Sequence, residues 1–120
     1  MYTVKFKIWM EKDGKIVIGS GGVEMLRHII KTKNLKKTAE KMGMSYRDAW
    51  GRMRDMERLV GSKVIESRRG GKDGTWTVVT PLGMEILSEY EKRYACVKKI
   101  VEKYFKNNPI RLKELREQHL

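Results

Sequence analysis

Residues 42–57 are "MGMSYRDAWGRMRDME", and this stretch decides how the rest of the chain is interpreted. Gly43 suits the left-handed residue that follows the end of a helix, because it has no side chain to clash there. Ser45 suits the cap of a following helix, which we expect to span residues 46–60 and to end at Gly61. The stretch therefore predicts a tight turn that leads into a helix carrying both arginines and large apolar residues.

A second predicted helix precedes this turn. The segment "LKKTAEKM" (35–42) places apolar residues on one face, and Asn34 before it is a suitable N-cap. Two helices joined by a short turn that contains glycine are typical of a helix-turn-helix, whose second helix enters the DNA major groove. Lys36 and Lys37, in the first turn of the first of these helices, are then expected to lie near phosphates.

The helix predicted over residues 46–60 has two different faces at 3.6 residues per turn. The apolar stripe holds Ala49, Met53, Met56 and Val60, and the basic stripe holds Arg47, Gly51, Arg54 and Arg58. Arginine is suited to bidentate contact with guanine, and a glycine between arginines allows a close approach to DNA. The alternative is a solvated face with ion pairs four residues apart, but that spacing gives the basic stripe no acidic partner. We therefore predict that the basic stripe contacts DNA.

Three further residues of this helix are interpreted separately. Tyr46, in the first turn, is expected to direct its hydroxyl to a phosphate. Trp50 is expected to lie partly in the core, with stacking on exposed bases as the alternative. Arg52 lies nearer the flank that faces the protein, where a pair with Asp48 or Asp55 is expected in place of base contact.

Strands are predicted on both sides of these helices. "TVKFKIWM" (3–10) and "IVI" (16–18) predict a hairpin around Asp13-Gly14, which is a strong two-residue turn signal. "GSGG" (19–22) lacks the Lys-Ser/Thr of a phosphate-binding loop, so it predicts a flexible turn into a helix beginning near residue 23.

A second hairpin is predicted by "SKVIESR" (62–68) and "TWTVVT" (75–80). Its tip spans residues 67–75, and the basic residues there are Arg68, Arg69 and Lys72. Such a tip is typical of a wing that follows the DNA backbone or enters the minor groove. The alternative is an ordinary hairpin with charged surface residues.

A long last helix is predicted from Pro81 to about residue 106, with Thr80 as its cap. Its apolar residues form more surface than one side of a small domain would hide. The side chains expected at an interface are Ile86, Tyr90, Val97, Ile100, Val101 and Tyr104. We predict that this helix pairs with its symmetry mate in a twofold dimer, with packing on its own domain as the alternative.

The composition agrees with a basic intracellular protein. The 120 residues predict one domain, with a hairpin over residues 1–19, the helix-turn-helix and wing over 21–79, the long helix over 80–108 and a tail over 109–120.

The net charge is +12, from 27 Lys and Arg and 15 Asp and Glu, and residues 31–72 hold 13 of the basic and 5 of the acidic residues. This clustering favours nucleic acid over an acidic membrane surface as the partner. One cysteine and no apolar run long enough to cross a membrane favour the cytoplasm.

Catalytic and metal-binding patterns are missing from the sequence. His28 and His119 have no plausible ligand or nucleophile partner by spacing, and Cys96 alone forms no cysteine cluster. We therefore expect neither an enzyme nor a bound metal or cofactor.

Four segments together resemble the N-terminal DNA-binding domain of the ModE family of molybdate-responsive transcription regulators. They are "MEKDGKIVIGSGGVEMLRHI" (10–29), "NLKKTAEKMGMSYRDAWGRMRDME" (34–57), "ESRRGG" (66–71) and "TPLGMEIL" (80–87). The resemblance covers residues 8–90 and is most specific at "GMSYRDAW", "RRGG" and "TPLG". It also extends to the wider LysR-type pattern.

The resemblance implies a winged helix-turn-helix that dimerises partly through its last long helix and acts at a palindromic operator. It places Ser45, Tyr46 and Arg47 at the start of the recognition helix and residues 68–72 in the wing. Full-length members carry a C-terminal molybdate-binding module, for which 120 residues leave no room. We therefore expect no molybdate binding by this chain alone, and the sequence does not identify a small-molecule effector.

The sequence thus predicts an α+β, mainly helical fold with an N-terminal hairpin and a long C-terminal dimerisation helix. The expected function is sequence-specific binding of double-stranded DNA by a homodimeric transcription regulator. Two alternatives remain open. One is an architectural, nucleoid-type protein with little sequence preference, and the other is a winged-helix module whose basic face binds an acidic protein.

Overall fold

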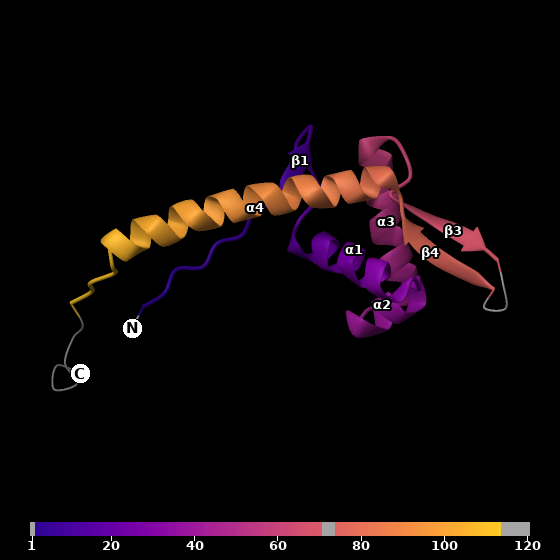
Figure 1. Ribbon diagram of the computed structural model, residues 1–120, viewed down its shortest axis with the longest axis horizontal. Helices are drawn as coiled ribbons and strands as arrows, with labels where there is room; N and C mark the ends of the chain where they lie inside the picture. Colours follow the sequence, from indigo (N-terminus) through magenta and orange to yellow (C-terminus); the bar gives the residue numbers. More distant parts are fainter. Residues whose placement is uncertain (1, 71–73, 114–120) are drawn as a thin grey trace.

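The computed structural model describes residues 2–70 and 74–113. Within these residues the chain is mainly helical, with two small antiparallel hairpins among the helices (Figure 1). The elements are β1 (Met10–Lys12), β2 (Lys15–Ile18), α1 (Ser20–Thr32), α2 (Leu35–Lys41), α3 (Tyr46–Val60), β3 (Ile65–Arg69), β4 (Thr75–Val79) and α4 (Pro81–Asn107). The predicted mixed, mainly helical class and the order of elements are confirmed.

The first hairpin is shorter than predicted. Its turn has positive φ at Asp13 (52°) and Gly14 (80°), as expected for this dipeptide. The pairing ends at Met10, opposite Ile18, because the chain enters α1 at Ser20 and leaves no further strand residue to pair, and the register shifts between Met10 and Glu11. Of the strand predicted over residues 3–10, residues 3–9 are therefore not part of a strand. They run beside α4 (Figure 1), where the Phe6 ring stacks on Tyr94 with centroids 5.1 Å apart.

The glycine-rich stretch after β2 begins α1 instead of forming a flexible turn. The helix begins at Ser20, three residues earlier than predicted. A side chain at Gly22 would place its Cβ 2.9 Å from Cγ1 of Ile18, so the glycine permits β2 and the first turn of α1 to pack closely. The buried residues of α1 are Val23, Met25, Leu26 and Ile29, and they lie at the centre of the core.

The start of α4 is fixed against the start of β3. Thr80 caps the helix by accepting a hydrogen bond from Gly83 N at 3.1 Å, and its hydroxyl donates to the Lys63 carbonyl at 2.7 Å. Its backbone N–H donates to the Val64 carbonyl at 2.9 Å. Gly83 lies so close to this connection that an added Cβ would be 2.5 Å from the Val64 carbonyl oxygen. The cap predicted at Thr80 is therefore confirmed, and it also joins α4 to the second hairpin.

The long α4 extends well beyond the other helices (Figure 1). At 1.5 Å per residue its 27 residues span about 40 Å. Ile86, Leu87 and Tyr90 in its first half are buried in the core of their own chain, whereas Ile100 in its second half is 63% exposed. Two of the predicted interface residues, Ile86 and Tyr90, are therefore already covered without a partner.

The remaining predicted interface residues lie farther along α4. Val97 and Val101 are half-buried, and Tyr104 is exposed like Ile100. Residues 108–113 form neither helix nor strand. No helix in the described part of the chain is both long enough and apolar enough to span a membrane.

Candidate nucleic-acid interface

The turn and cap before α3 have the geometry that the sequence predicts. Gly43 has φ of 67°, in the left-handed region that glycine favours. The Ser45 hydroxyl accepts a hydrogen bond from Asp48 N at 3.0 Å, and Asn34 caps α2 in the same way through Lys37 N at 2.8 Å. Gly61, with φ of 83°, follows the last turn of α3. The connection between α2 and α3 is thus short, and it is fixed by the backbone hydrogen bond from Met44 N to the Ala39 carbonyl at 3.0 Å on one side and by the Ser45 cap on the other.

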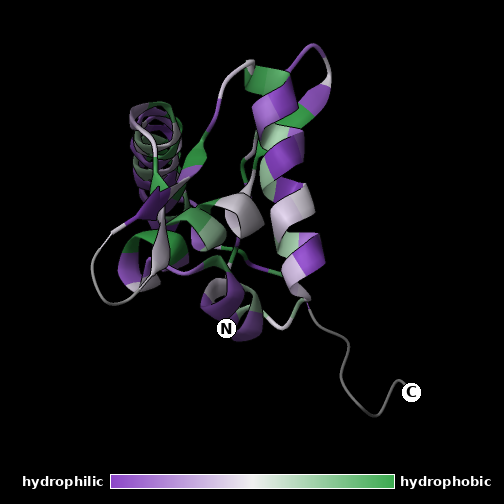
Figure 2. Ribbon diagram, turned by 90° about the vertical axis from the view of Figure 1, so that its right-hand side faces the viewer, coloured by the Kyte–Doolittle hydropathy of each residue, from purple (hydrophilic) through white to green (hydrophobic). Residues whose placement is uncertain are grey.

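The two faces of α3 are also as predicted, and the helix carries both hydrophobic and hydrophilic segments in Figure 2. Ala49, Met53 and Met56 are buried, and Val60 is half-buried. On the basic stripe Arg47, Arg54 and Arg58 are exposed. A Cβ added to Gly51, which lies between them, would meet no atom within 4 Å. The basic stripe is therefore an open surface on a helix held by its opposite face.

Two arginines of the basic stripe have acidic partners three residues away along the helix, not four. Arg58 pairs with Asp55, and Arg54 Nη1 lies 3.9 Å from Glu57 Oε1. The interpretation of a stripe without acidic neighbours is therefore wrong. Both groups of the Arg58–Asp55 pair are more than two-thirds exposed, so water screens that interaction strongly.

Trp50 is less buried than expected. It is 46% exposed, and the Arg54 guanidinium carbon lies 4.7 Å from the centre of its ring. This distance is typical of a cation–π contact, in which the positive guanidinium lies over the face of the indole ring. Trp50 therefore contributes to the basic face as a support for Arg54. Tyr46, one turn before it, is also about half exposed.

The second hairpin lies beside α3, and the two elements enclose a groove of about 430 Å³. The charged and aromatic residues that line it are Tyr46, Trp50, Arg54, Glu57, Lys63, Glu66 and Arg68. Arg68 pairs with Glu66 of the same strand at 3.0 Å, and both Arg68 and Arg69 are exposed. The structure thus brings the basic stripe of α3 and the basic end of the hairpin to one surface. Lys72 lies outside the described residues.

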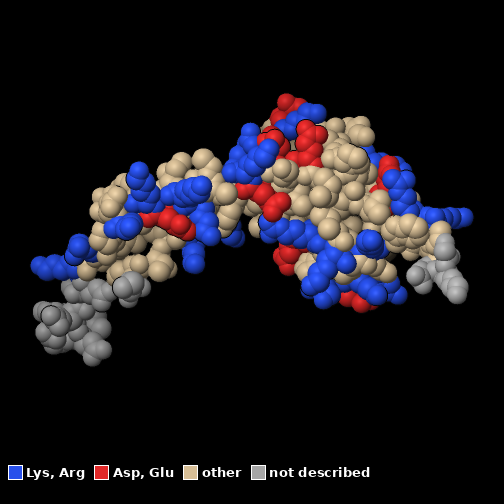
Figure 3. All heavy atoms as spheres, viewed as in Figure 1, with Lys and Arg blue, Asp and Glu red and all other residues tan. Residues whose placement is uncertain are grey.

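Other basic side chains lie around this surface. Lys36 and Lys37 are exposed at the start of α2. Figure 3 shows further Lys and Arg side chains toward the end of the β3–β4 hairpin and along the far half of α4.

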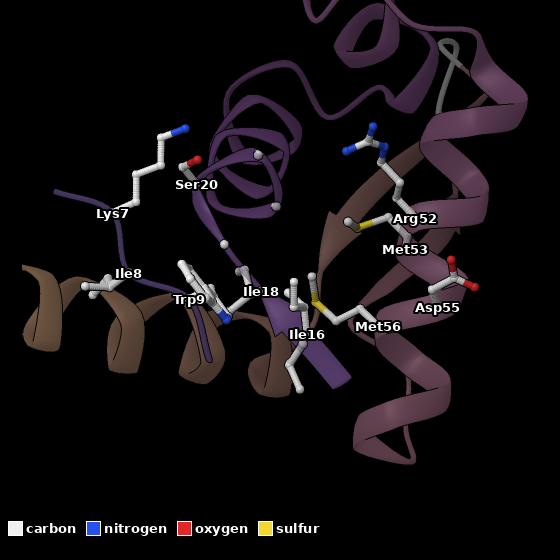
Figure 4. A pocket seen from close by; sticks show the side chains of 14 residues that line it. Lys7, Ile8, Trp9, Ile16, Ile18, Ser20, Arg52, Met53, Asp55 and Met56 are labelled. Carbon is white, nitrogen blue, oxygen red and sulfur yellow. The ribbon is translucent and has the colours of Figure 1, made fainter. Parts of the chain in front are cut away.

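Arg52 lies apart from the basic stripe, as predicted. It faces the first turn of α1 across a pocket between α3 and the first hairpin (Figure 4). Neither of the two pairs predicted for Arg52, with Asp48 or with Asp55, is present among these described residues, and Asp55 pairs with Arg58.

Glu57 belongs to this surface, although the sequence pattern alone does not indicate it. Its side chain is 11% exposed, and Oε2 accepts hydrogen bonds from Val64 N at 3.0 Å and Ile65 N at 3.4 Å. Its position three residues after Arg54 was a signal for the ion pair, whereas the contacts with Val64 and Ile65 depend on the tertiary fold. Glu57 therefore connects the basic stripe to the start of the hairpin.

Comparison with known proteins gives related sequences. The chain is 30% identical to the molybdenum-pterin-binding protein MopB of Rhodobacter capsulatus over 90 residues, which are 75% of this chain and 33% of MopB. It is 29% identical to the DNA-binding transcriptional dual regulator ModE of Escherichia coli strain K12 over 69 residues, 58% of this chain and 26% of that protein. The molybdenum transport protein ModE of Herbaspirillum seropedicae is 32% identical over 68 residues, 57% of this chain and 25% of that protein.

These matches relate the chain to ModE- and MopB-like proteins over more than half of its length. The chain spans only a quarter to a third of the length of these curated relatives. No protein-family model matches it.

Proposed function

We propose that this chain is the DNA-binding part of a ModE-like transcription regulator and that it folds as a winged helix-turn-helix. In this proposal α3 is the recognition helix and lies in the major groove. The β3–β4 hairpin is the wing and contacts the phosphate backbone or the minor groove. The observation that carries the proposal is the open stripe of Arg47, Gly51, Arg54 and Arg58 on α3, opposite its buried face.

The positions of the basic residues support two roles, with some residues contacting bases and others contacting phosphates. Arg47 lies in the first turn of α3, the part of a recognition helix that lies nearest the bases, and Arg54 follows two turns later on the same open stripe. Lys36, Lys37 and Arg69 are exposed on the neighbouring elements and suit phosphates as point charges or forked donors. The similarity to ModE of Escherichia coli, which is a DNA-binding regulator, supports the same function.

We also propose that the regulator is a homodimer that pairs through the far half of α4. Exposed Ile100 and Tyr104 support this interface, because large apolar side chains gain free energy when a partner covers them. Two recognition helices would then bind half-sites about 34–36 Å apart. Analytical ultracentrifugation at micromolar concentration is expected to show a dimer, and a species of only 14.1 kDa would contradict this part of the proposal.

The experiment that tests the function is selection of bound sequences from random duplex DNA, followed by affinity measurements on the selected site. Arg47→Ala and Arg54→Ala are each expected to cost about 1–3 kcal/mol and to relax the preference at particular base pairs. Lys36→Ala is the matched control, because loss of a phosphate contact weakens binding to all sequences alike. Equal weakening on every sequence by the arginine variants would refute base recognition by α3.

One observation favours an architectural DNA-binding protein as the second candidate. Four exposed lysines share one face of α4 outside the helix-turn-helix, and among the described residues they form no ion pair: Lys92, Lys99, Lys103 and Lys106. A basic surface of this extent suits sequence-independent contact with phosphates. A steep salt dependence without any enriched sequence after selection would favour this candidate. Failure to bind any duplex at low salt would instead favour a module that binds an acidic protein.

A further inference from the structure

Glu57 is the one acidic side chain of α3 that is largely buried. Its Oε2 accepts the N–H groups of Val64 and Ile65, and its Oε1 lies 3.9 Å from Arg54 Nη1. A carboxylate that is 11% exposed loses most of its hydration, so it is stable there only when such partners replace the water. Its two oxygens therefore have separate partners: one faces the start of β3 and the other faces the basic stripe.

The backbone that Glu57 binds is itself held in place. Val64 is fully buried, and its carbonyl accepts the Thr80 N–H at 2.9 Å. The Thr80 hydroxyl donates to the neighbouring Lys63 carbonyl at 2.7 Å. Because this segment is fixed between the start of α4 and the start of β3, the Glu57 carboxylate has little freedom to move with Arg54.

Arg54 is held between this carboxylate and an aromatic ring. Its guanidinium carbon lies 4.7 Å from the centre of the Trp50 ring, and Nη1 faces Glu57. The Arg54 side chain is still 48% exposed, so part of its guanidinium faces solvent. A long side chain that is ordered before binding loses less conformational entropy when it contacts a ligand. Arg54 thus differs from Arg58, whose pair with Asp55 is exposed on both sides.

We infer that Glu57 is a positioning residue for sequence recognition: it orders Arg54 for base contact and fixes the hairpin relative to α3. This inference rests on the proposed function. It predicts that removal of the Glu57 charge lowers discrimination between sequences without lowering the affinity for unrelated duplex. Discrimination falls because Arg54 is less ordered, while affinity for unrelated duplex is kept or rises because the net positive charge grows by one. Damage to the fold alone would lower both.

The test compares Glu57→Gln with Glu40→Gln in the full chain. Both variants remove one negative charge, but Glu40 is exposed on α2 and lies outside the contacts described above. Binding to the selected duplex and to an unrelated duplex is measured by fluorescence anisotropy over a series of salt concentrations. Glu57→Gln is expected to lower the ratio of the two affinities about five- to tenfold, which is part of the effect of one base contact. Glu40→Gln is expected to leave the ratio unchanged.

A double-mutant cycle with Arg54→Ala separates positioning from a structural role. In the Arg54→Ala background, Glu57→Gln is expected to change the affinity ratio by less than twofold, because the residue that it positions is gone. Glu57→Asp keeps the charge with a shorter reach and is expected to give an intermediate ratio. If Glu57→Gln does not fold, Glu57→Asp takes its place in the double-mutant cycle.

Two outcomes overturn the inference separately from the proposed function. An unchanged affinity ratio in Glu57→Gln, with a wild-type chain that discriminates, refutes the positioning role alone. An equal loss of discrimination with and without Arg54 refutes it in the same way. A wild-type chain that binds all duplexes equally refutes the proposed function and the inference with it.

Discussion

Replacement of Gly51 by alanine is expected to stabilise the fold and to weaken DNA binding at the same time. Gly51 lies inside α3, and a Cβ placed there would meet no atom within 4 Å. Alanine in a helix interior is more stable than glycine by about 0.5–1 kcal/mol when the added methyl causes no clash. For a chain of this length the melting temperature should rise by about 2–5 °C.

The same methyl group would project from the basic stripe between Arg47 and Arg54. If this stripe lies against bases or phosphates, the helix has to move outward or lose a contact. The expected cost is about 1–3 kcal/mol of binding free energy, comparable to one base contact. Thermal denaturation followed by circular dichroism and fluorescence anisotropy with the selected duplex measure the two effects on the same sample.

Gly83→Ala is the matched control, because it makes the same change in a crowded part of a helix. Its Cβ would lie 2.5 Å from the Val64 carbonyl oxygen and 2.6 Å from Val79 Cγ1. Overpacking of this kind costs about 1–3 kcal/mol, and here the oxygen is already bound by Thr80 N, so the melting temperature should fall. A lower melting temperature for Gly51→Ala would show that the added methyl group at position 51 does meet other atoms. A higher one with unchanged affinity would refute DNA contact at Gly51.

Three more outcomes are expected from the contacts of single residues. Ser45→Ala should lower the free energy of unfolding by about 1 kcal/mol in urea denaturation, since Asp48 N loses its capping acceptor. Thr80→Val should lower it by about 1–3 kcal/mol in the same assay, because the buried hydroxyl bonds both Lys63 O and Gly83 N. Burial raises the pKa of Tyr90 above its ordinary value of 10.0, with Tyr94 adding to the rise and Arg27 opposing it. The folded state therefore keeps this proton longer, so the free energy of unfolding is unaffected by it below pH 10.0 and falls as the pH rises above that value. Tyr90→Phe should reduce that alkaline loss, and an unchanged loss would show that Tyr90 does not cause it.

The sequence predicts α3 well because its signals are local. Ser45 and Gly61 mark its two ends, and the spacing of Met53 and Met56 shows which side is buried. Each of these signals acts within one or two helical turns, so a periodic pattern and a cap are sufficient to locate them. Thr80 and Pro81 mark the start of α4 by signals that are equally local.

Where tertiary contacts decide the conformation, local patterns are insufficient. Residues 3–10 alternate as a strand does, but Phe6 stacks on Tyr94 from α4 and only Met10 joins the ladder. The alternating pattern indicates an apolar face, and it does not show whether a strand or a helix will cover that face. Glu57 is a second example of this kind. Its position in the pattern of α3 gives no sign that the backbone amides of Val64 and Ile65 bind its carboxylate.

The ion pairs on the basic face are compatible with binding of a polyanion, and they differ in how exposed the acidic partner of each arginine is. The Arg58–Asp55 pair is mostly exposed and the Arg68–Glu66 pair is partly exposed, and surface pairs of this kind are typically worth about 0–1 kcal/mol. DNA phosphates can replace these partners at little cost, because phosphate contacts also release condensed counterions. Arg54 differs because its acidic partner is largely buried and fixed by backbone hydrogen bonds. Under the proposed function, the exposed pairs would therefore exchange partners on any duplex, whereas Arg54, with its buried acidic partner, would be the arginine that distinguishes one base pair from another.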